Sequence, residues 1–170
     1  MMSFEDIVFT IQIFHKNGLT VEAAELLIRE YDLSHPNFKG IELREKAKPD
    51  FILMTTEGEI GEPQIIRIPE NTFEFPLDLM LNLLAHEMLH VHQKSAEIAL
   101  KDRNEREWQA YYEMLFHKKF PLIPTLSTYY LKAFAIKGLS YYNKMKEGSE
   151  FQLKYESQKK EVDDLLQIIG

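Results

Sequence analysis

The stretch LLAHEMLHVHQ, residues 83–93, places three of the chain's six histidines in an otherwise apolar segment. The region 76–100 contains no glycine, and its only proline stands at the first position, so we predict a single helix over this region. Residues four apart on a helix lie one turn above each other, which places His86 and His90 on one face with Cβ atoms about 5–6 Å apart. His92 points well away from that face, so we predict that it is not a ligand.

The motif H-E-x-x-H, residues 86–90, suits the chemistry of a zinc ion. Two histidines one turn apart can share one zinc ion, and the glutamate that follows the first histidine borders the site without ligating the metal. Glu87 is therefore the candidate general base for a water whose pKa the metal lowers. The alternative is a coincidental motif made of core histidines and a glutamate that reaches solvent. An apolar helix holds three such side chains only if partners or a metal satisfy them.

Composition and charge narrow the possible functions. Hydrophobic residues make up 45% of the 170 residues and charged residues 28%, which predicts one compact domain over 1–170, with a motif core at about 51–120 and a helical hairpin at about 125–168. The net charge is −7 and the basic residues are scattered, so we expect no nucleic-acid partner. The chain has no cysteine, so His, Asp or Glu must hold any metal.

The N-terminal segment indicates where the chain resides. It carries acidic residues where a secretory signal needs a positively charged region, and it is predicted to be an amphipathic helix. No run of about eighteen apolar residues occurs in the chain, so we expect no membrane span. These patterns predict a cytoplasmic protein.

The remaining patterns predict an α+β fold. Ser3 and Thr20 are candidate N-caps of two helices, and Pro63 and Pro69 flank a strand that we therefore expect at the edge of a sheet. The predicted elements are helices at 4–16 and 21–31, strands at 41–44, 51–56 and 64–69, and, after the motif helix, helices at 103–120, 125–146 and 150–168. We expect about three strands beside the motif helix, enclosed by helices from both ends of the chain.

A catalytic zinc site needs a third protein ligand and an open fourth position. The chain downstream of the motif must supply that ligand. The candidates by residue type are Glu97, Asp102, Glu105, Glu107, Glu113 and His117.

The motif and the segment that follows it resemble a known family. HEMLHVHQ, followed 17 residues after His90 by EWQAY and preceded by a strand pair, resembles a small bacterial gluzincin-type zinc metallopeptidase over about residues 51–115. Residues 104–115, NEREWQAYYEML, are similar to the E-x-x-A stretch on the second gluzincin helix. The resemblance implies that Glu107 is the third zinc ligand and that Ala110 leaves room for the motif helix.

Two alternatives to this ligand set exist. Metzincins carry a third histidine six residues after the motif, and Ala96 occupies that position here, which excludes that class. Glu105 is the main rival of Glu107, because an error of two residues in helix register would exchange them. The two side chains point about 160° apart, so only one of them can face the metal.

The resemblance also implies a function. It predicts zinc-dependent hydrolysis of peptide bonds in a peptide or protein substrate, with Glu87 as general base. In such enzymes an edge strand borders the cleft and pairs with the extended substrate, and we assign that role to residues 64–69. A zincin that cleaves one regulatory protein, a degenerate zinc-binding module and a helical interaction protein are the rival hypotheses.

The developing oxyanion needs a hydrogen-bond donor in addition to the metal. Tyr111, one turn beyond Glu107, is the candidate donor, with four competitors: Tyr112, His117, Tyr129 and Tyr130. Gln93 lies seven positions after His86 and either supports the site by hydrogen bonds or lies on the surface. Asn82 is placed to form a hydrogen bond along the same face of the motif helix. The sequence does not indicate the oligomeric state.

Overall fold

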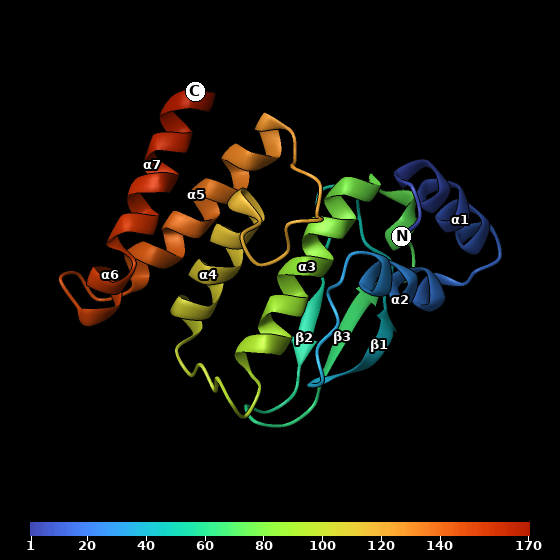
Figure 1. Ribbon diagram of the computed structural model, residues 1–170, viewed down its shortest axis with the longest axis horizontal. Coiled ribbons are helices and arrows are strands. Elements are labelled where there is room, and N and C mark those ends of the chain that lie inside the picture. The colour runs from blue at the N-terminus through green and yellow to red at the C-terminus, as the bar shows by residue number, and fades with distance from the viewer.

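The computed structural model describes residues 1–170 and confirms the α+β class, with helices at both ends of the chain and a three-stranded mixed sheet (Figure 1). In chain order the elements are α1 (Phe4–Lys16), α2 (Thr20–Glu30), β1 (Phe38–Arg44), β2 (Thr55–Glu57), β3 (Gln64–Pro69), the 3-10 helix η1 (Thr72–Glu74), α3 (Leu77–Gln93), α4 (Arg103–Phe116), α5 (Thr128–Lys144), α6 (Glu150–Lys154) and α7 (Glu156–Ile169).

The predicted edge position of residues 64–69 is wrong, because β3 is the central strand. It pairs parallel to β1 and antiparallel to β2 in the order β1-β3-β2. Pro69 is tolerated at the end of this strand, where the next main-chain amide, that of Glu70, donates to Arg44 O at 3.1 Å. The edge strand nearest the motif helix is therefore β2, not β3.

The strand predicted at 51–56 is much shorter in the structure. Only Thr55–Glu57 pairs with β3. Phe51 forms an isolated bridge with Lys48, and the main chain of residues 52–54 forms no hydrogen bond within the protein. An apolar run with β-branched residues thus continues alongside the sheet without joining it.

The motif helix and its successor end earlier than predicted. α3 stops at Gln93, where the Gln93 carbonyl accepts from Leu100 N at 2.8 Å in a turn that contains Ala99 at φ 44°. The predicted start of α4 is confirmed, because Asp102 accepts from the third helical amide. This helix ends at Phe116 rather than residue 120, since the next residue adopts a left-handed conformation.

The terminal helices follow the predictions with local differences. Ser3 caps α1 as predicted, whereas Thr20 is the first residue of α2 and its hydroxyl donates to Glu70 O instead of capping. The single helix predicted at 150–168 is divided at Tyr155 into α6 and α7. None of the helices is both long enough and apolar enough to cross a bilayer.

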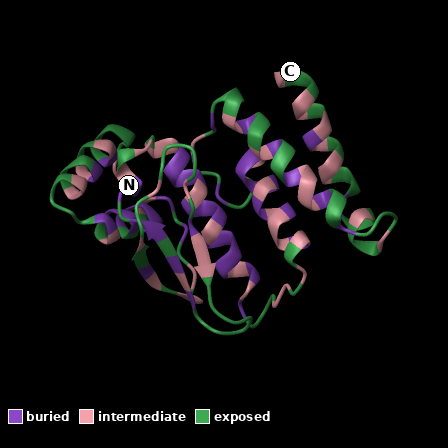
Figure 2. Ribbon diagram, turned by 180° about the vertical axis from the view of Figure 1, so that it is seen from behind, coloured by how far each residue is buried: buried purple, intermediate pink, exposed green.

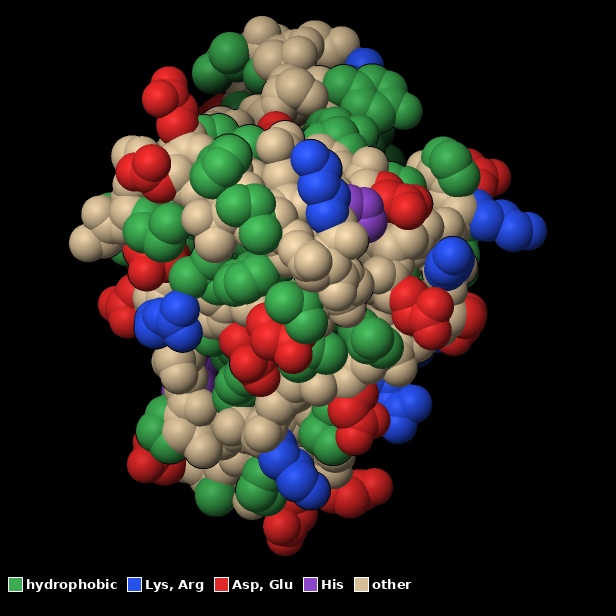
Figure 3. All heavy atoms as spheres, turned by 90° about the vertical axis from the view of Figure 1, so that its right-hand side faces the viewer, with side chains coloured by type: hydrophobic (Ala, Val, Ile, Leu, Met, Phe, Trp, Pro, Cys, Tyr) green, Lys and Arg blue, Asp and Glu red, His purple; other side chains and the backbone are tan.

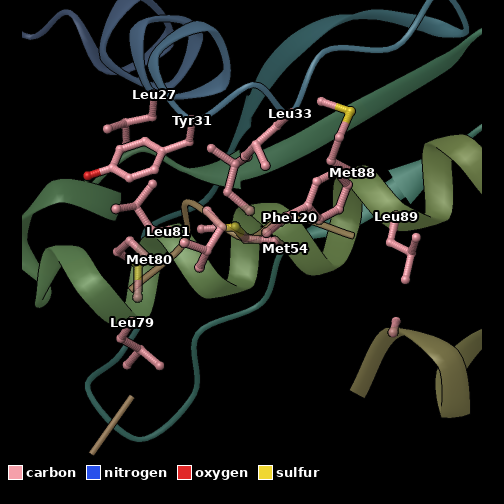
Figure 4. Packing of buried hydrophobic residues seen from close by; sticks show 14 of the residues in the cluster. Leu27, Tyr31, Leu33, Met54, Leu79, Met80, Leu81, Met88, Leu89 and Phe120 are labelled. Atoms are coloured by element: carbon pink, nitrogen blue, oxygen red, sulfur yellow. The ribbon is translucent and has the colours of Figure 1, made fainter. Parts of the chain in front are cut away.

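α3 lies between the sheet and α4, and α5 and α7 follow beyond α4 (Figure 1). Most residues of α3 are buried (Figure 2). Leu81 and Met88 of α3 belong to a core that also contains Leu27 of α2 and Leu33 (Figure 4). This packing fixes the position of α3. The face of α3 that bears His86 and His90 is turned toward α4.

Candidate metal centre

Three side chains from α3 and α4 converge at the centre of the molecule. Nε2 of His86 and Nε2 of His90 are 3.2 Å apart. The Glu107 carboxylate lies 3.3 Å from the first of these nitrogens and 3.4 Å from the second, through one oxygen to each. The two histidines are 6% and 7% exposed, so this is a buried group of side chains that could hold a metal ion.

Hydrogen bonds indicate which nitrogen of His90 is free. The amide nitrogen of Gln93 donates to Arg106 O and to Gln109 Oε1, which orients the Gln93 oxygen toward His90. That oxygen lies 2.7 Å from His90 Nδ1 and is only an acceptor, so Nδ1 carries the proton and donates. His90 therefore presents the lone pair of Nε2 to the centre.

His86 is also protonated on Nδ1, although the acceptor of its hydrogen bond is weaker. Its Nδ1 lies 3.1 Å from the sulfur of Met114, which can only accept a hydrogen bond. With Nδ1 protonated in both rings, two nitrogen lone pairs and a carboxylate face one another with no donor among them. Such an arrangement is repulsive unless a cation, either a proton or a metal ion, lies between them.

The donor set fits zinc. In a tetrahedral site with bonds of about 2.0–2.1 Å, neighbouring donor atoms are separated by roughly 3.3 Å. The three separations between His86, His90 and Glu107 are 3.2, 3.3 and 3.4 Å. Two imidazoles and one carboxylate are also the ligand set of a known class of catalytic zinc sites, which leave the fourth position open.

The pKa values in the centre show mutual stabilisation. Burial lowers the pKa of His90, but a protonated Nε2 would donate to Glu107, and this contact and the charges of Glu87 and Glu107 outweigh burial and raise the pKa overall. Burial raises the pKa of Glu107, but His86 and His90, which donate to its carboxylate when they are protonated, outweigh burial and hold that pKa well below its usual range. The site thus favours positive charge at its centre.

Glu87 lies beside the three ligands and is held by the edge strand. The hydroxyl of Thr56 in β2 donates to Glu87 Oε2 at 2.7 Å and also lies 2.9 Å from the Glu87 main-chain oxygen. This leaves the second carboxylate oxygen without a protein partner. Thr56 was not a candidate in the sequence, because no sequence pattern shows which strand residue faces the helix.

A cavity of about 770 Å³ opens over the centre. Residues 50–56 form one wall and α5 forms the other, while His86, Glu87, His90 and Glu107 lie between them. Tyr111 also lines the cavity, with its ring packed edge-on against His86 at 4.6 Å between centroids. Burial and the charge of Glu107 raise the pKa of Tyr111, so its phenol keeps a proton to donate at neutral pH.

The other candidate ligands lie away from the centre. Glu105 is buried and accepts from Tyr155 OH at 2.5 Å and from Lys154 at 2.9 Å. Asp102 caps α4, and Glu113 accepts from the main-chain amides at 119 and 120. Glu97 is exposed, and His117 pairs through Nε2 with Asn82 Oδ1. Among the six candidate residues, only Glu107 faces both histidines.

The remaining polar residues of α3 divide between support of the site and packing. Gln93 orients His90 by a hydrogen bond, which agrees with the first of the two alternatives predicted for this residue, support of the site rather than a surface position. Asn82 donates to Asp78 O one turn earlier and to Pro124 O, so it tethers a loop rather than the metal centre. His92 faces away from the site as predicted, with its ring against His35. No bonded partner satisfies His92 Nε2, which is buried.

Met114, like Thr56, is a supporting residue that the sequence analysis did not identify. It lies seven residues after Glu107, two helical turns along the same stripe, so the spacing could have drawn attention to it.

No protein-family model matches this chain, and no curated protein or solved structure is significantly similar to it. The resemblance to gluzincin peptidases therefore rests on the H-E-x-x-H motif and on the geometry of His86, His90 and Glu107.

Proposed function

We propose that this protein is a zinc-dependent metallopeptidase. The observation that carries the proposal is the set of three donor atoms on His86, His90 and Glu107, which face one another at tetrahedral separations without a hydrogen-bond donor among them. A bound zinc ion would supply a Lewis acid that polarises the scissile carbonyl and lowers the pKa of the attacking water.

The side chains around the centre would carry the proton and orient the substrate. Glu87 takes a proton from the attacking water through its free oxygen, while Thr56 holds the other oxygen in place. The same glutamate can then protonate the leaving amine. Tyr111 donates a hydrogen bond to the developing oxyanion from the side of His86.

The edge-strand role belongs to the segment that contains β2 rather than to β3. Both sides of β3 are already paired, so residues 64–69 cannot accept a further strand. Residues 52–54 line the cavity, and their main-chain donors and acceptors are free within the protein. An extended peptide can pair with this segment and pass over the metal centre, which gives affinity without reading side chains.

The proposal is tested with the purified protein and a mixture of peptides from digested cellular protein. We expect about one zinc per chain by elemental analysis, and new peptide termini by mass spectrometry. Glu87→Gln should retain the zinc and lower the rate of hydrolysis by about 10²–10⁴-fold, because it removes the general base. Glu97→Gln, an exposed glutamate after the same helix, is the matched control and should cleave normally.

Full activity of the Glu87→Gln variant would contradict its role as base. Absence of zinc under all loading conditions would contradict the enzyme class as a whole. A wild-type protein that binds zinc and produces no new termini in the mixture would have the properties of a binding module or of a protease for one specific protein.

A further inference from the structure

Two stripes of side chains run past the metal centre toward the same end of the cleft. On α3 the stripe is His86, His90 and Lys94, each four residues after the last, and helical hydrogen bonding continues to the Lys94 amide. On α4 the stripe is Tyr111, Glu107 and Arg103, given in order of decreasing residue number. The helices are antiparallel, since His86 contacts Met114 while Gln93 contacts Arg106.

Each stripe therefore places a cation one helical turn beyond its metal ligand. Lys94 follows His90, and Arg103 precedes Glu107, both at the end where the loop 94–102 joins the two helices. Arg106, one turn from Arg103, lines the same end. Four residues of helix advance about 6 Å, so these cations lie about that far from the ligands along the cleft.

The charge of the cleft differs from that of the rest of the protein. The chain carries a net charge of −7. On the face that bears α1 and β1, Lys and Arg side chains are scattered singly among Asp and Glu (Figure 3). Apart from the site residues Glu87 and Glu107, however, the charged residues that line the cavity are one acid, Asp50, and four bases, Lys94, Arg103, Arg106 and Lys137.

The four bases form no salt bridge, because none of them lies within ion-pairing distance of a carboxylate. Lys94 donates only to Gly58 O, and Arg106 is anchored through one nitrogen to the carbonyls of Leu100 and Lys101, which leaves its other donors free. Burial, followed by repulsion from Arg106, outweighs the attraction of Glu59, Glu87 and Glu57 and lowers the pKa of Lys94.

We propose that Lys94, Arg103 and Arg106 form a carboxylate-binding subsite in the cleft, so that the preferred substrate carries a carboxylate about two residues from the scissile bond. The inference rests on the proposed peptidase function for the position of the bond. An extended peptide advances about 3.3 Å per residue, so the 6 Å between metal ligands and cations spans two residues. The carboxylate can belong to an Asp or Glu side chain or to the C-terminus of the substrate.

The subsite is tested by binding, with the zinc removed by a chelator so that the carboxylate cannot bind the metal instead. Three short, fluorescein-labelled, alanine-rich peptides are compared by fluorescence anisotropy: one with a single Glu and an amidated C-terminus, one with Gln in its place, and one with Gln and a free C-terminus. We expect the wild-type protein to bind the Glu peptide about five to ten times more tightly than the amidated Gln peptide, in proportion to a few exposed ion pairs.

Charge reversal gives the matched comparison. Arg103→Glu should abolish the preference for the Glu peptide, and Lys39→Glu, at an exposed lysine of β1 outside the cavity, should retain it with a change in net charge of the same sign and size. The preference should also weaken at about 1 M salt, where the screening length falls to roughly 3 Å. If only the free C-terminus gives tighter binding, the subsite holds and its natural ligand is a chain terminus.

Equal binding of all three peptides, no binding of any of them, or an equal loss in the Lys39→Glu control would overturn the subsite. The peptidase function is scored separately by cleavage of the digest with zinc present. Cleavage without Asp, Glu or a terminus about two residues from the cut would retain the peptidase and overturn the subsite. A Glu preference in binding without cleavage of the digest would retain the subsite and remove the activity on general peptides.

Discussion

Two histidine pairs involve the same helix, and only one of them is suited to a metal. His86 and His90 face Glu107 in the cavity, with ring centroids 4.8 Å apart. His92 lies on another face of α3 with its ring centroid 4.1 Å from that of His35. Proximity of two imidazoles is therefore common to both pairs and does not by itself define a metal site.

The difference lies in the charges and contacts around each pair. Carboxylates surround the first pair and raise the pKa of His90. Burial, followed by the charges of Lys119 and His35, lowers the pKa of His92 to about 4. An aromatic ring packs edge-on against each pair, Tyr111 in the cavity and Phe120 in the other case, but only the first carries a hydroxyl. A carboxylate and an open cavity distinguish the metal centre from a packed histidine pair.

The largest expected effect is the loss of a ligand. His90→Ala should weaken zinc binding by more than the 10–100-fold that removal of a supporting partner costs, because a direct bond is lost. His92→Ala should retain zinc and lower the free energy of unfolding by about 1–2 kcal/mol through lost packing. Competition with a chelator and thermal melting measure the two quantities. Equal zinc loss in both variants would show that the two pairs act together.

The next effect separates the two glutamates of α4. Glu107→Gln removes the charge from the metal centre and should abolish stoichiometric zinc binding while the fold is retained. Glu105→Gln should keep the zinc, because Glu105 bonds Tyr155 and Lys154 instead. It should lower the free energy of unfolding by about 1–3 kcal/mol, since a buried charged hydrogen bond is lost. At this chain length each kcal/mol lowers Tm by roughly 2–4 °C. Zinc loss in Glu105→Gln and not in Glu107→Gln would reverse the assignment.

The choice between these glutamates shows what helical spacing can predict. The pitch of a helix is constant, so the pairing of His86 with His90 and the opposition of Glu105 to Glu107 follow from sequence separation alone. Asp102 caps the start of α4. Which of the two faces the histidines depends on how α4 packs against α3, and spacing alone does not contain that information.

The sheet shows where local patterns fail. The prolines beside β3 suggested an edge strand, but Pro69 needs no amide donor at the strand end, so both neighbours can still pair. Thr56 reaches Glu87 only because β2 lies beside α3. Strand order and contacts between distant segments depend on tertiary packing, so the motif helix could be predicted and the wall of the cleft beside it could not.

A third prediction concerns the hydroxyl group that distinguishes Tyr111 from Phe120. Tyr111→Phe places a ring without a hydroxyl against His86, as Phe120 lies against His92. Zinc binding should be unchanged, and kcat should fall by about 10²-fold if the phenol stabilises the oxyanion. Tyr112→Phe is the control, because the Tyr112 hydroxyl pairs with Lys118 and Glu161 outside the cavity. An unchanged kcat in Tyr111→Phe would assign Tyr111 to packing only.

The smallest effects concern the partners that hold the two ligating rings. Gln93 accepts from His90 Nδ1 at 2.7 Å, so Gln93→Ala should weaken zinc binding by about 10–100-fold, through loss of ring orientation and ligand basicity. Met114→Leu keeps the apolar volume beside His86 and removes only a weak acceptor, so a change of a few-fold is expected. Zinc titrations of both variants measure the difference. If Met114→Leu weakens binding as much as Gln93→Ala, packing of the rings rather than hydrogen bonding to Nδ1 orients them. The distinction between the two histidine pairs would then rest on Glu107 alone.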